Sequence, residues 1–146
     1  MKIAVIRLKG KFSVSPSVKN TLIDLKLDRL YACTLLPEGA TAKGMIQACK
    51  DVVSFGEANK ESIALLLSKR GRAIDGKKLT DVKKPEEIEK IASEAESSPK
   101  KLEELGVSPV FFLSPPRGGF GKRKAHVPFG PVGKNPNINE LISSMA

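Results

Sequence analysis

The sequence predicts an α+β fold, in which a small sheet carries helices on one face. Two short apolar runs, at residues 2–8 and 30–36, are rich in β-branched, aromatic and other apolar side chains and read as strands. Each run is followed by a segment whose apolar residues recur at the helical period of 3.6. The resulting β-α-β-α order predicts that the first two strands are parallel, or are separated by another strand, with both helices on the same face.

The first strand and helix have clear boundaries. Gly10 ends the apolar run of the first strand. Ser15 is expected to cap the helix and Pro16 to occupy its first position, because a Ser side chain satisfies free backbone amides and Pro lacks an amide hydrogen. The apolar stripe of this helix follows at Val18, Leu22 and Leu25.

The next elements are less sharply bounded. The second strand stops at the Pro-Glu-Gly of residues 37–39, and Thr41 is expected to cap the second helix. A third strand is placed at residues 52–55, with Gly56 as its break, and a fourth at residues 110–113. The stripe of the second helix is Ala42, Met45, Ile46, Cys49 and Val53.

A helical insert is expected next, over residues 59–106. Its first helix is capped by Asn59 and ends at Gly71, its second begins at Pro85, and a short third one covers residues 98–106. Asn137 precedes a last amphipathic helix. The complete expectation is a ferredoxin-like open-faced sandwich with a β-α-β-α-β core at residues 1–58, the insert at 59–106, and a last strand, an extended basic arm and a C-terminal helix at 107–146.

Composition narrows the class of partner. The chain of 146 residues has a formal net charge of +9, which favours a nucleic-acid partner over an anionic membrane surface. No apolar run is long enough to span a bilayer, and the N-terminus lacks a signal-peptide core, so a cytoplasmic protein is expected. Cys33 and Cys49 lack metal-ligand spacing and are interpreted as small core residues.

The most informative chemistry lies at residues 114–126, SPPRGGFGKRKAH, which we call the arm. It contains no acidic residue and is rich in glycine, proline, arginine and lysine, so it is expected to be extended and to gain a fixed shape from a polyanionic partner. Glycines let a backbone approach phosphates, and cations neutralise them. The alternative is a solvated basic linker.

Two further basic groups accompany the arm. The first surrounds Phe12, which could stack on an unpaired base, and the second surrounds Gly71, where two arginines could clamp a phosphate. The alternatives are ordinary solvated lysines and helix capping. The candidate RNA-binding residues are Arg7, Lys9, Lys11, Phe12, Lys19, Arg29, Lys43, Arg70, Arg72, Arg117, Gly118, Gly119, Phe120, Lys122, Arg123, Lys124 and His126.

Enzyme chemistry finds little support. His126 is the sole histidine and has no nucleophile or acidic residue near it in sequence. The glycines at residues 118–121 lack the strand, the helix and the GK[ST] ending of a P-loop. We therefore expect no catalytic residue, cofactor, metal or small-molecule substrate.

The order and spacing of several short motifs resemble a known family. They are the TL-x-x-L-x-L-x-R pattern at residues 21–29, the Gly44-Met45 pair, Phe-Gly-Glu at 55–57, LLLSKRGR at 65–72 and the arm itself. Together they resemble the large-subunit ribosomal protein L-thirty family in its longer archaeal form, which is related to eukaryotic L-seven. Phe55 stands where many longer relatives have Trp. Eukaryotic members carry a long basic N-terminal extension, so a chain starting at the first strand favours an archaeal source.

The resemblance implies a structural constituent of the large ribosomal subunit. Its expected partners are 23S-type rRNA, with 5S rRNA as a second candidate, and neighbouring large-subunit ribosomal proteins. Two alternatives are a regulatory ferredoxin-like domain that binds a small molecule and an mRNA-binding module.

Overall fold

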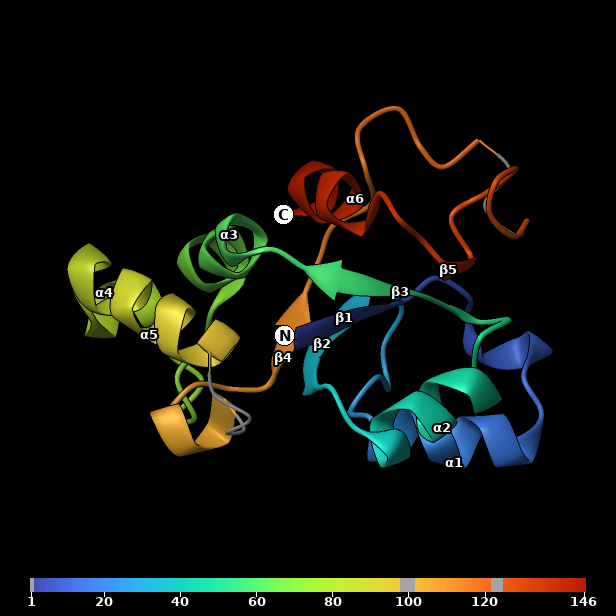
Figure 1. The fold of residues 1–146 in the computed structure, drawn as a ribbon, viewed down its shortest axis with the longest axis horizontal. Coiled ribbons are helices and arrows are strands. Elements are labelled where there is room, and N and C mark those ends of the chain that lie inside the picture. The colour runs from blue at the N-terminus through green and yellow to red at the C-terminus, as the bar shows by residue number, and fades with distance from the viewer. Residues whose placement is uncertain (1, 98–101, 122–124) are drawn as a thin grey trace.

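A computed structural model describes residues 2–97, 102–121 and 125–146 (Figure 1). The strands and α-helices follow one another along the chain as β1 (Lys2–Arg7), α1 (Pro16–Asp24), β2 (Ala32–Pro37), α2 (Ala40–Ala48), β3 (Val53–Ala58), α3 (Lys60–Arg70), α4 (Leu79–Val82), α5 (Pro85–Ser97), β4 (Val110–Phe112), β5 (Gly133–Lys134) and α6 (Ile138–Met145). Two 3-10 helices, η1 (Lys11–Ser13) and η2 (Leu102–Leu105), complete them. No helix of the described residues is long and apolar enough to cross a membrane.

The five strands form one sheet in the order β4-β2-β1-β3-β5. β1 lies between β2 and β3 and is antiparallel to both, with Ile6 opposite Cys33 on one side and Ser54 on the other. The prediction that the first two strands are parallel, or separated by another strand, is therefore wrong. β2 and β3 are parallel to each other across β1, which is the arrangement that a single crossover helix, α2, can connect.

The connection after α1 explains the antiparallel pairing. Instead of crossing the sheet, the chain turns back through Lys26 and Tyr31, both in the left-handed region with φ values of 59° and 61°. The backbone amide of Tyr31 then donates to the carbonyl of Arg7, at 2.9 Å. β2 consequently starts where β1 ends and runs in the opposite direction.

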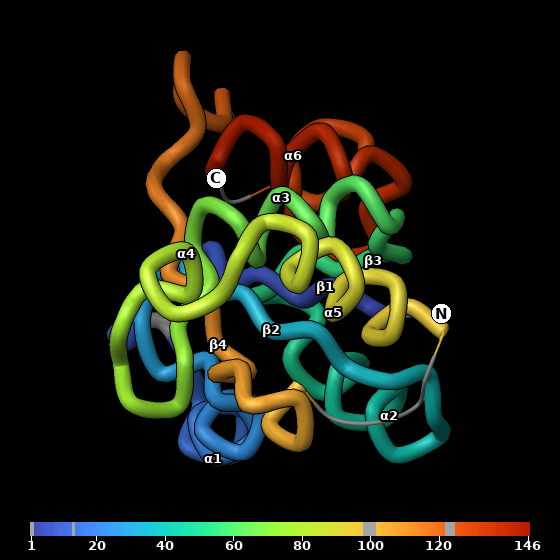
Figure 2. The backbone as a smooth tube through the Cα atoms, turned by 90° about the vertical axis from the view of Figure 1, so that its left-hand side faces the viewer, coloured from blue at the N-terminus to red at the C-terminus, as the bar shows by residue number. Residues whose placement is uncertain are grey.

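Both faces of the sheet are covered (Figures 1 and 2). Side chains alternate along β1, so Val5 packs with α1 and α2 while Ala4 and Ile6 pack with α3, α5 and α6. The core matches the ferredoxin-like expectation, but the face that an open sandwich leaves bare is occupied by the insert and the C-terminal helix. The insert contributes its apolar stripe to the same core as the strands.

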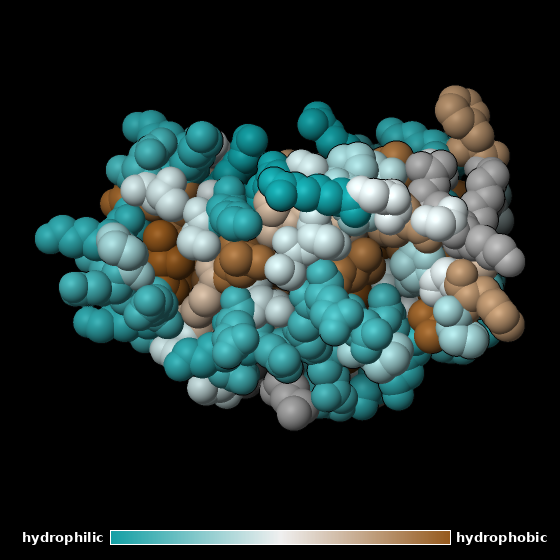
Figure 3. Space-filling view, turned by 90° about the horizontal axis from the view of Figure 1, so that it is seen from above, coloured by the Kyte–Doolittle hydropathy of each residue, from teal (hydrophilic) through white to brown (hydrophobic). Residues whose placement is uncertain are grey.

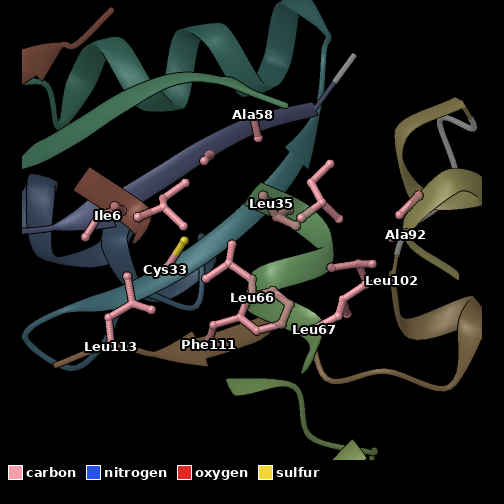
Figure 4. Close-up of a cluster of buried hydrophobic side chains, with 14 of the residues drawn as sticks. Ile6, Cys33, Leu35, Ala58, Leu66, Leu67, Ala92, Leu102, Phe111 and Leu113 are labelled. Carbon is pink, nitrogen blue, oxygen red and sulfur yellow. The ribbon is translucent and has the colours of Figure 1, made fainter. Parts of the chain in front are cut away.

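That larger core joins segments far apart in the chain. Leu66 and Leu67 of α3 lie against Cys33 and Leu35 of β2 and Phe111 of β4 (Figure 4). Each fully buried leucine contributes about 1.5–3 kcal/mol of hydrophobic stabilisation. Residues from all three predicted parts of the chain share this cluster, so the insert packs as an integral layer of the fold.

At the β3–β5 edge of the sheet, the chain before α6 lies very close to the backbone of β3. β3 continues through Gly56, where a break was expected, because the chain before α6 packs directly on it. A Cβ atom at Gly56 would lie 2.5 Å from the carbonyl oxygen of Asn135 and 2.9 Å from Ile138 Cγ2. β5, which has no sequence pattern of its own, runs parallel to β3 with Gly133 opposite Ser54.

Most helix boundaries follow the sequence. Ser15 Oγ accepts from the amide of Val18 at 3.5 Å, α5 starts at Pro85, and Asn137 precedes α6, as predicted. Thr41 is not a cap, because α2 already begins at Ala40 with Gly39 before it. The predicted helix at 98–106 is represented by η2, and residues 98–101 lie outside the described residues.

Candidate nucleic-acid interface

Strand directions bring several candidate residues to one end of the sheet. β1 ends there, β2 and β3 begin there, and β4 ends there, because β1 is antiparallel to β2 and β3 and β4 is antiparallel to β2. The arm leaves from the end of β4. We call this region the basic end; its members are Lys9, Lys11, Phe12, Arg29, Arg117 and His126.

The loop between β1 and α1 presents an aromatic ring among lysines. The Phe12 side chain is fully exposed, and Lys11 beside it is exposed as well. Lys11 Nζ lies 3.4 Å from Asp28 Oδ1, an exposed pair that water screens well, so the lysine can exchange its partner at little cost. An exposed phenylalanine flanked by cations is the arrangement that single-stranded RNA readers use for stacking.

Arg29 adds a second cation beside an aromatic ring. Its guanidinium carbon lies 5.4 Å from the ring centroid of Phe112, the last residue of β4, within the range of a cation–π contact. Arg29 is exposed and Phe112 is 38% exposed. The contact orients the guanidinium without removing its hydrogen-bonding edge from solvent.

The described part of the arm is held on the body. Pro116 is buried and accepts from the Gly119 amide at 3.1 Å, in a turn where Gly118 and Gly119 have φ values of 82° and 76°. Phe120 stacks on Tyr31, with ring centroids 5.9 Å apart and planes inclined by 26°. The described part of the arm therefore has contacts of its own with the body, beside the shape that a partner was expected to give it. Phe120, predicted to contact RNA, is engaged by the body.

The far side of the arm is also tied down. His126 Nε2 lies 3.2 Å from Asp51 Oδ1, in the turn before β3. Beyond it the chain makes a turn with a cis Val127–Pro128 bond, and the Gly130 amide donates to the His126 carbonyl at 3.0 Å. The side chain of Phe129 in this turn is 77% exposed. The sequence did not lead us to predict Phe129 as a candidate, although the surrounding Pro-Phe-Gly-Pro is typical of a tight turn. Lys122, Arg123 and Lys124 lie outside the described residues.

Arg7 does not belong to this surface. The residue is 2% exposed, and its Nη1 donates to the carbonyls of Leu27 and Asp28 at 2.7 and 2.9 Å, while Nε donates to that of Lys9 at 2.9 Å. Burial lowers the pKa of the guanidinium and the Asp28 charge opposes that shift. Arg7 thus holds the returning chain that sets the direction of β2, and the prediction of an RNA-facing role for it is corrected here.

The remaining candidates lie elsewhere. Arg70 donates from Nη2 to Ser114 Oγ at 2.7 Å and to the Ala146 carbonyl at 3.2 Å, so it joins α3 to the arm and the C-terminus. Lys43 pairs with Glu38 at 2.7 Å at the opposite end of β2. Lys19 on α1 and Arg72 after α3 are exposed. The predicted phosphate clamp therefore loses one of its two arginines to an internal contact.

The two cysteines are buried, free thiols, as predicted. Burial raises the pKa of Cys33 to about 12 and that of Cys49 to about 11. Neither forms a thiolate near neutral pH, so neither is an activated nucleophile. Among the described residues no group of His, Cys, Asp and Glu could hold a metal ion.

Comparisons with known proteins agree with this architecture. Residues 3–53 match the family model described as ribosomal protein L30p/L7e. A relative named large ribosomal subunit protein uL30 from Archaeoglobus fulgidus is 40% identical over 151 residues, covering 97% of this chain and 98% of that protein. The chain belongs to this ribosomal protein family.

Other family members support the full-length match. The protein named large ribosomal subunit protein uL30 from Methanothrix thermoacetophila is 34% identical, covering 97% of this chain and 98% of its own length. The one from Staphylothermus marinus is 38% identical, with 97% and 96% covered. The likeness to these relatives therefore extends over nearly the whole chain.

Proposed function

We propose that this protein is a non-catalytic constituent of the large ribosomal subunit that binds 23S-type rRNA through the basic end. The observation that carries the proposal is that Lys9, Lys11 and Arg29 accompany the fully exposed Phe12 at one end of the sheet, the end from which the arm with its exposed Arg117 leaves β4. The family supports the ribosomal setting, and the geometry supports the choice of surface.

Each group of the basic end has a distinct task in this proposal. The lysines and arginines neutralise phosphates and release counterions, which supplies sequence-independent affinity. Phe12 stacks on an unpaired base, which selects loops and junctions over continuous duplex. Because Phe120 and His126 hold the arm against the body, Arg117 meets the RNA from a partly ordered segment and less conformational entropy is lost on binding.

The arm supplies the remaining contacts. Gly118 and Gly119 carry no side chain that would keep a phosphate away from the backbone of this turn, and open space surrounds both. Lys122, Arg123 and Lys124 extend the positive charge in sequence, His126 is a further RNA contact in this proposal, and Lys19 and Arg72 are peripheral contacts. The proposed partners also include 5S rRNA and neighbouring large-subunit ribosomal proteins.

Salt dependence of rRNA binding tests the proposal. A variant with Lys9, Lys11, Arg29 and Arg117 all changed to Ala should bind large-subunit rRNA more weakly and reduce the slope of log K against log [salt] by roughly three units, since each phosphate contact contributes about 0.7–0.9. Its control, Lys60, Lys77, Lys84 and Lys90 changed to Ala, removes the same charge from exposed positions of the insert. Equal slopes for the two variants would refute the choice of surface.

Sedimentation tests the ribosomal assignment separately. The native protein should comigrate with the large subunit in a sucrose gradient at low and moderate salt. Protein that stays at the top of both gradients would contradict the assignment, and a small-molecule or mRNA ligand would then be sought.

A further inference from the structure

A shallow apolar groove lies between α3 and α5, on the side of the molecule away from the basic end (Figure 1). Its cavity measures about 320 Å³. The groove is lined by Glu61, Ala64, Leu65 and Ser68 of α3, by Pro85, Ile88 and Glu89 of α5, and by Thr80 and Lys83. We call its apolar residues, Ala64, Leu65, Pro85 and Ile88, the floor and its two exposed carboxylates, Glu61 and Glu89, the rim. The residues of each helix are spaced three or four apart, so the groove follows the two helices along one face of each.

Two of the polar side chains that line the groove, those of Ser68 and Lys83, are engaged inside the chain. Ser68 Oγ donates to the carbonyl of Leu65 in its own helix at 3.1 Å. Lys83 Nζ donates to the carbonyl of Leu105 at 3.3 Å. The floor therefore offers apolar surface, and Val82 of the neighbouring α4, 52% exposed, extends the apolar area beside it.

The charged residues that line this groove are Glu61, Glu89 and Lys83, so carboxylates are in excess there although the protein as a whole is basic. In a chain of net charge +9, α5 carries five glutamates and a single lysine, Lys90. Glu61 and Glu89 are exposed, and no ion pair within residues 2–97, 102–121 and 125–146 includes either. Figure 3 shows apolar atoms between hydrophilic ones at the end that carries α4 and α5. An anionic rim repels RNA phosphates and attracts a cationic ligand.

We infer that this groove docks a Lys/Arg-rich segment of another protein, which places one or two apolar side chains on the floor and its cations against Glu61 and Glu89. The volume is at the lower end of the roughly 300–1,000 Å³ of small-molecule pockets, which suits the side chains of a peptide better than a whole buried ligand. An amphipathic segment laid in a groove between two helices is an established mode of peptide recognition. The inference concerns another surface than the proposed RNA contact and does not depend on it.

Binding of designed peptides to the full chain tests the inference. The probes are a fluorescent Leu/Lys amphipathic peptide of about four helical turns, its counterpart with Ser in place of Leu, and a Leu/Glu counterpart. Fluorescence anisotropy should show that the Leu/Lys peptide binds at least about tenfold more tightly than either counterpart, since it alone has both the apolar face and the positive charge.

Matched variants locate the binding. Glu61→Gln combined with Glu89→Gln should lower the affinity for the Leu/Lys peptide about tenfold. Glu87→Gln combined with Glu94→Gln makes the same charge change on exposed positions of α5 that do not line the groove, and should leave the affinity unchanged. Equal losses in the two variants, or equal binding of the Leu/Lys and Ser/Lys peptides, would reduce the effect to general charge attraction and overturn the inference.

Discussion

Replacing Arg7 with Met separates a structural role from an RNA-binding one. Met has a similar unbranched shape but no donors, so the substitution removes the three hydrogen bonds from the guanidinium to the carbonyls of Lys9, Leu27 and Asp28. Those carbonyls belong to the segments that leave β1 and return to β2. The substitution therefore weakens the contacts that hold the end of β1 to the chain returning into β2, and these contacts set the direction of β2.

The expected loss of stability follows from these bonds. A buried acceptor left without its donor costs about 1–3 kcal/mol. The bond to Leu27 is buried, and those to Lys9 and Asp28 are part-buried and cost less each, because water can reach the freed carbonyl. Part of this cost is offset, because removing a buried guanidinium relieves its desolvation and because its Nη2 is buried with no hydrogen-bond partner among the described residues. We expect a net loss of about 3 kcal/mol, which lowers the melting temperature by about 10 °C in a chain of this size.

The assay is thermal and urea unfolding followed by far-UV circular dichroism, with rRNA affinity measured in parallel below the transition. Lys9→Met is the matched control: it removes one cation two residues away, from a half-buried side chain at the basic end. We expect the Arg7→Met protein to lose stability and to keep most of its RNA affinity per folded molecule. The Lys9→Met protein should keep its stability and bind RNA more weakly. An Arg7→Met protein that unfolds like the wild type while losing RNA affinity would refute the structural role of Arg7.

Two further predictions concern buried contacts. Phe120→Ala removes the stack on Tyr31 and should make trypsin cleave the arm faster in limited digestion. The free energy of unfolding should fall by about 1–2 kcal/mol. An unchanged digestion rate would contradict an anchored arm. Cys33 and Cys49 should resist iodoacetamide in the native protein at pH 8 and react fully in urea. The reason is that burial excludes the reagent and raises the thiol pKa values to about 12 and about 11. Rapid alkylation of the native protein, measured by mass spectrometry, would contradict this.

Local patterns in the sequence predicted much of the secondary structure. The Ser15-Pro16 start of α1, the Pro85 start of α5 and the residue before α6 follow from the chemistry of helix ends, which involves only neighbours in the chain. The β3 extension through Gly56 could not be predicted in this way. Its glycine indicates a close approach of another segment, and the sequence does not say which segment approaches.

The sequence predicted which kinds of residue form the candidate surface, but not which individual residues lie on it. Lys11, Phe12 and Arg29 lie exposed and Lys9 half-buried at one end of the sheet, whereas Arg7 of the same region points inward. The difference between Arg7 and Lys9 depends on where the returning chain places its carbonyls, which is a long-range property. Charge alone does not distinguish a cation that binds phosphates from one that binds backbone oxygens within the fold.

The sequence by itself determined the family, the α+β class, the starts of α1 and α5, the buried cysteines and the excess of positive charge, because each depends on composition or on contacts between near neighbours. Only the tertiary structure decided that β1 is antiparallel to β2, that both faces of the sheet are covered, and that Phe120 packs on Tyr31. These outcomes depend on which distant segments meet. An apolar face in the sequence shows that burial is needed, and the packing of the whole chain selects the surface that provides it.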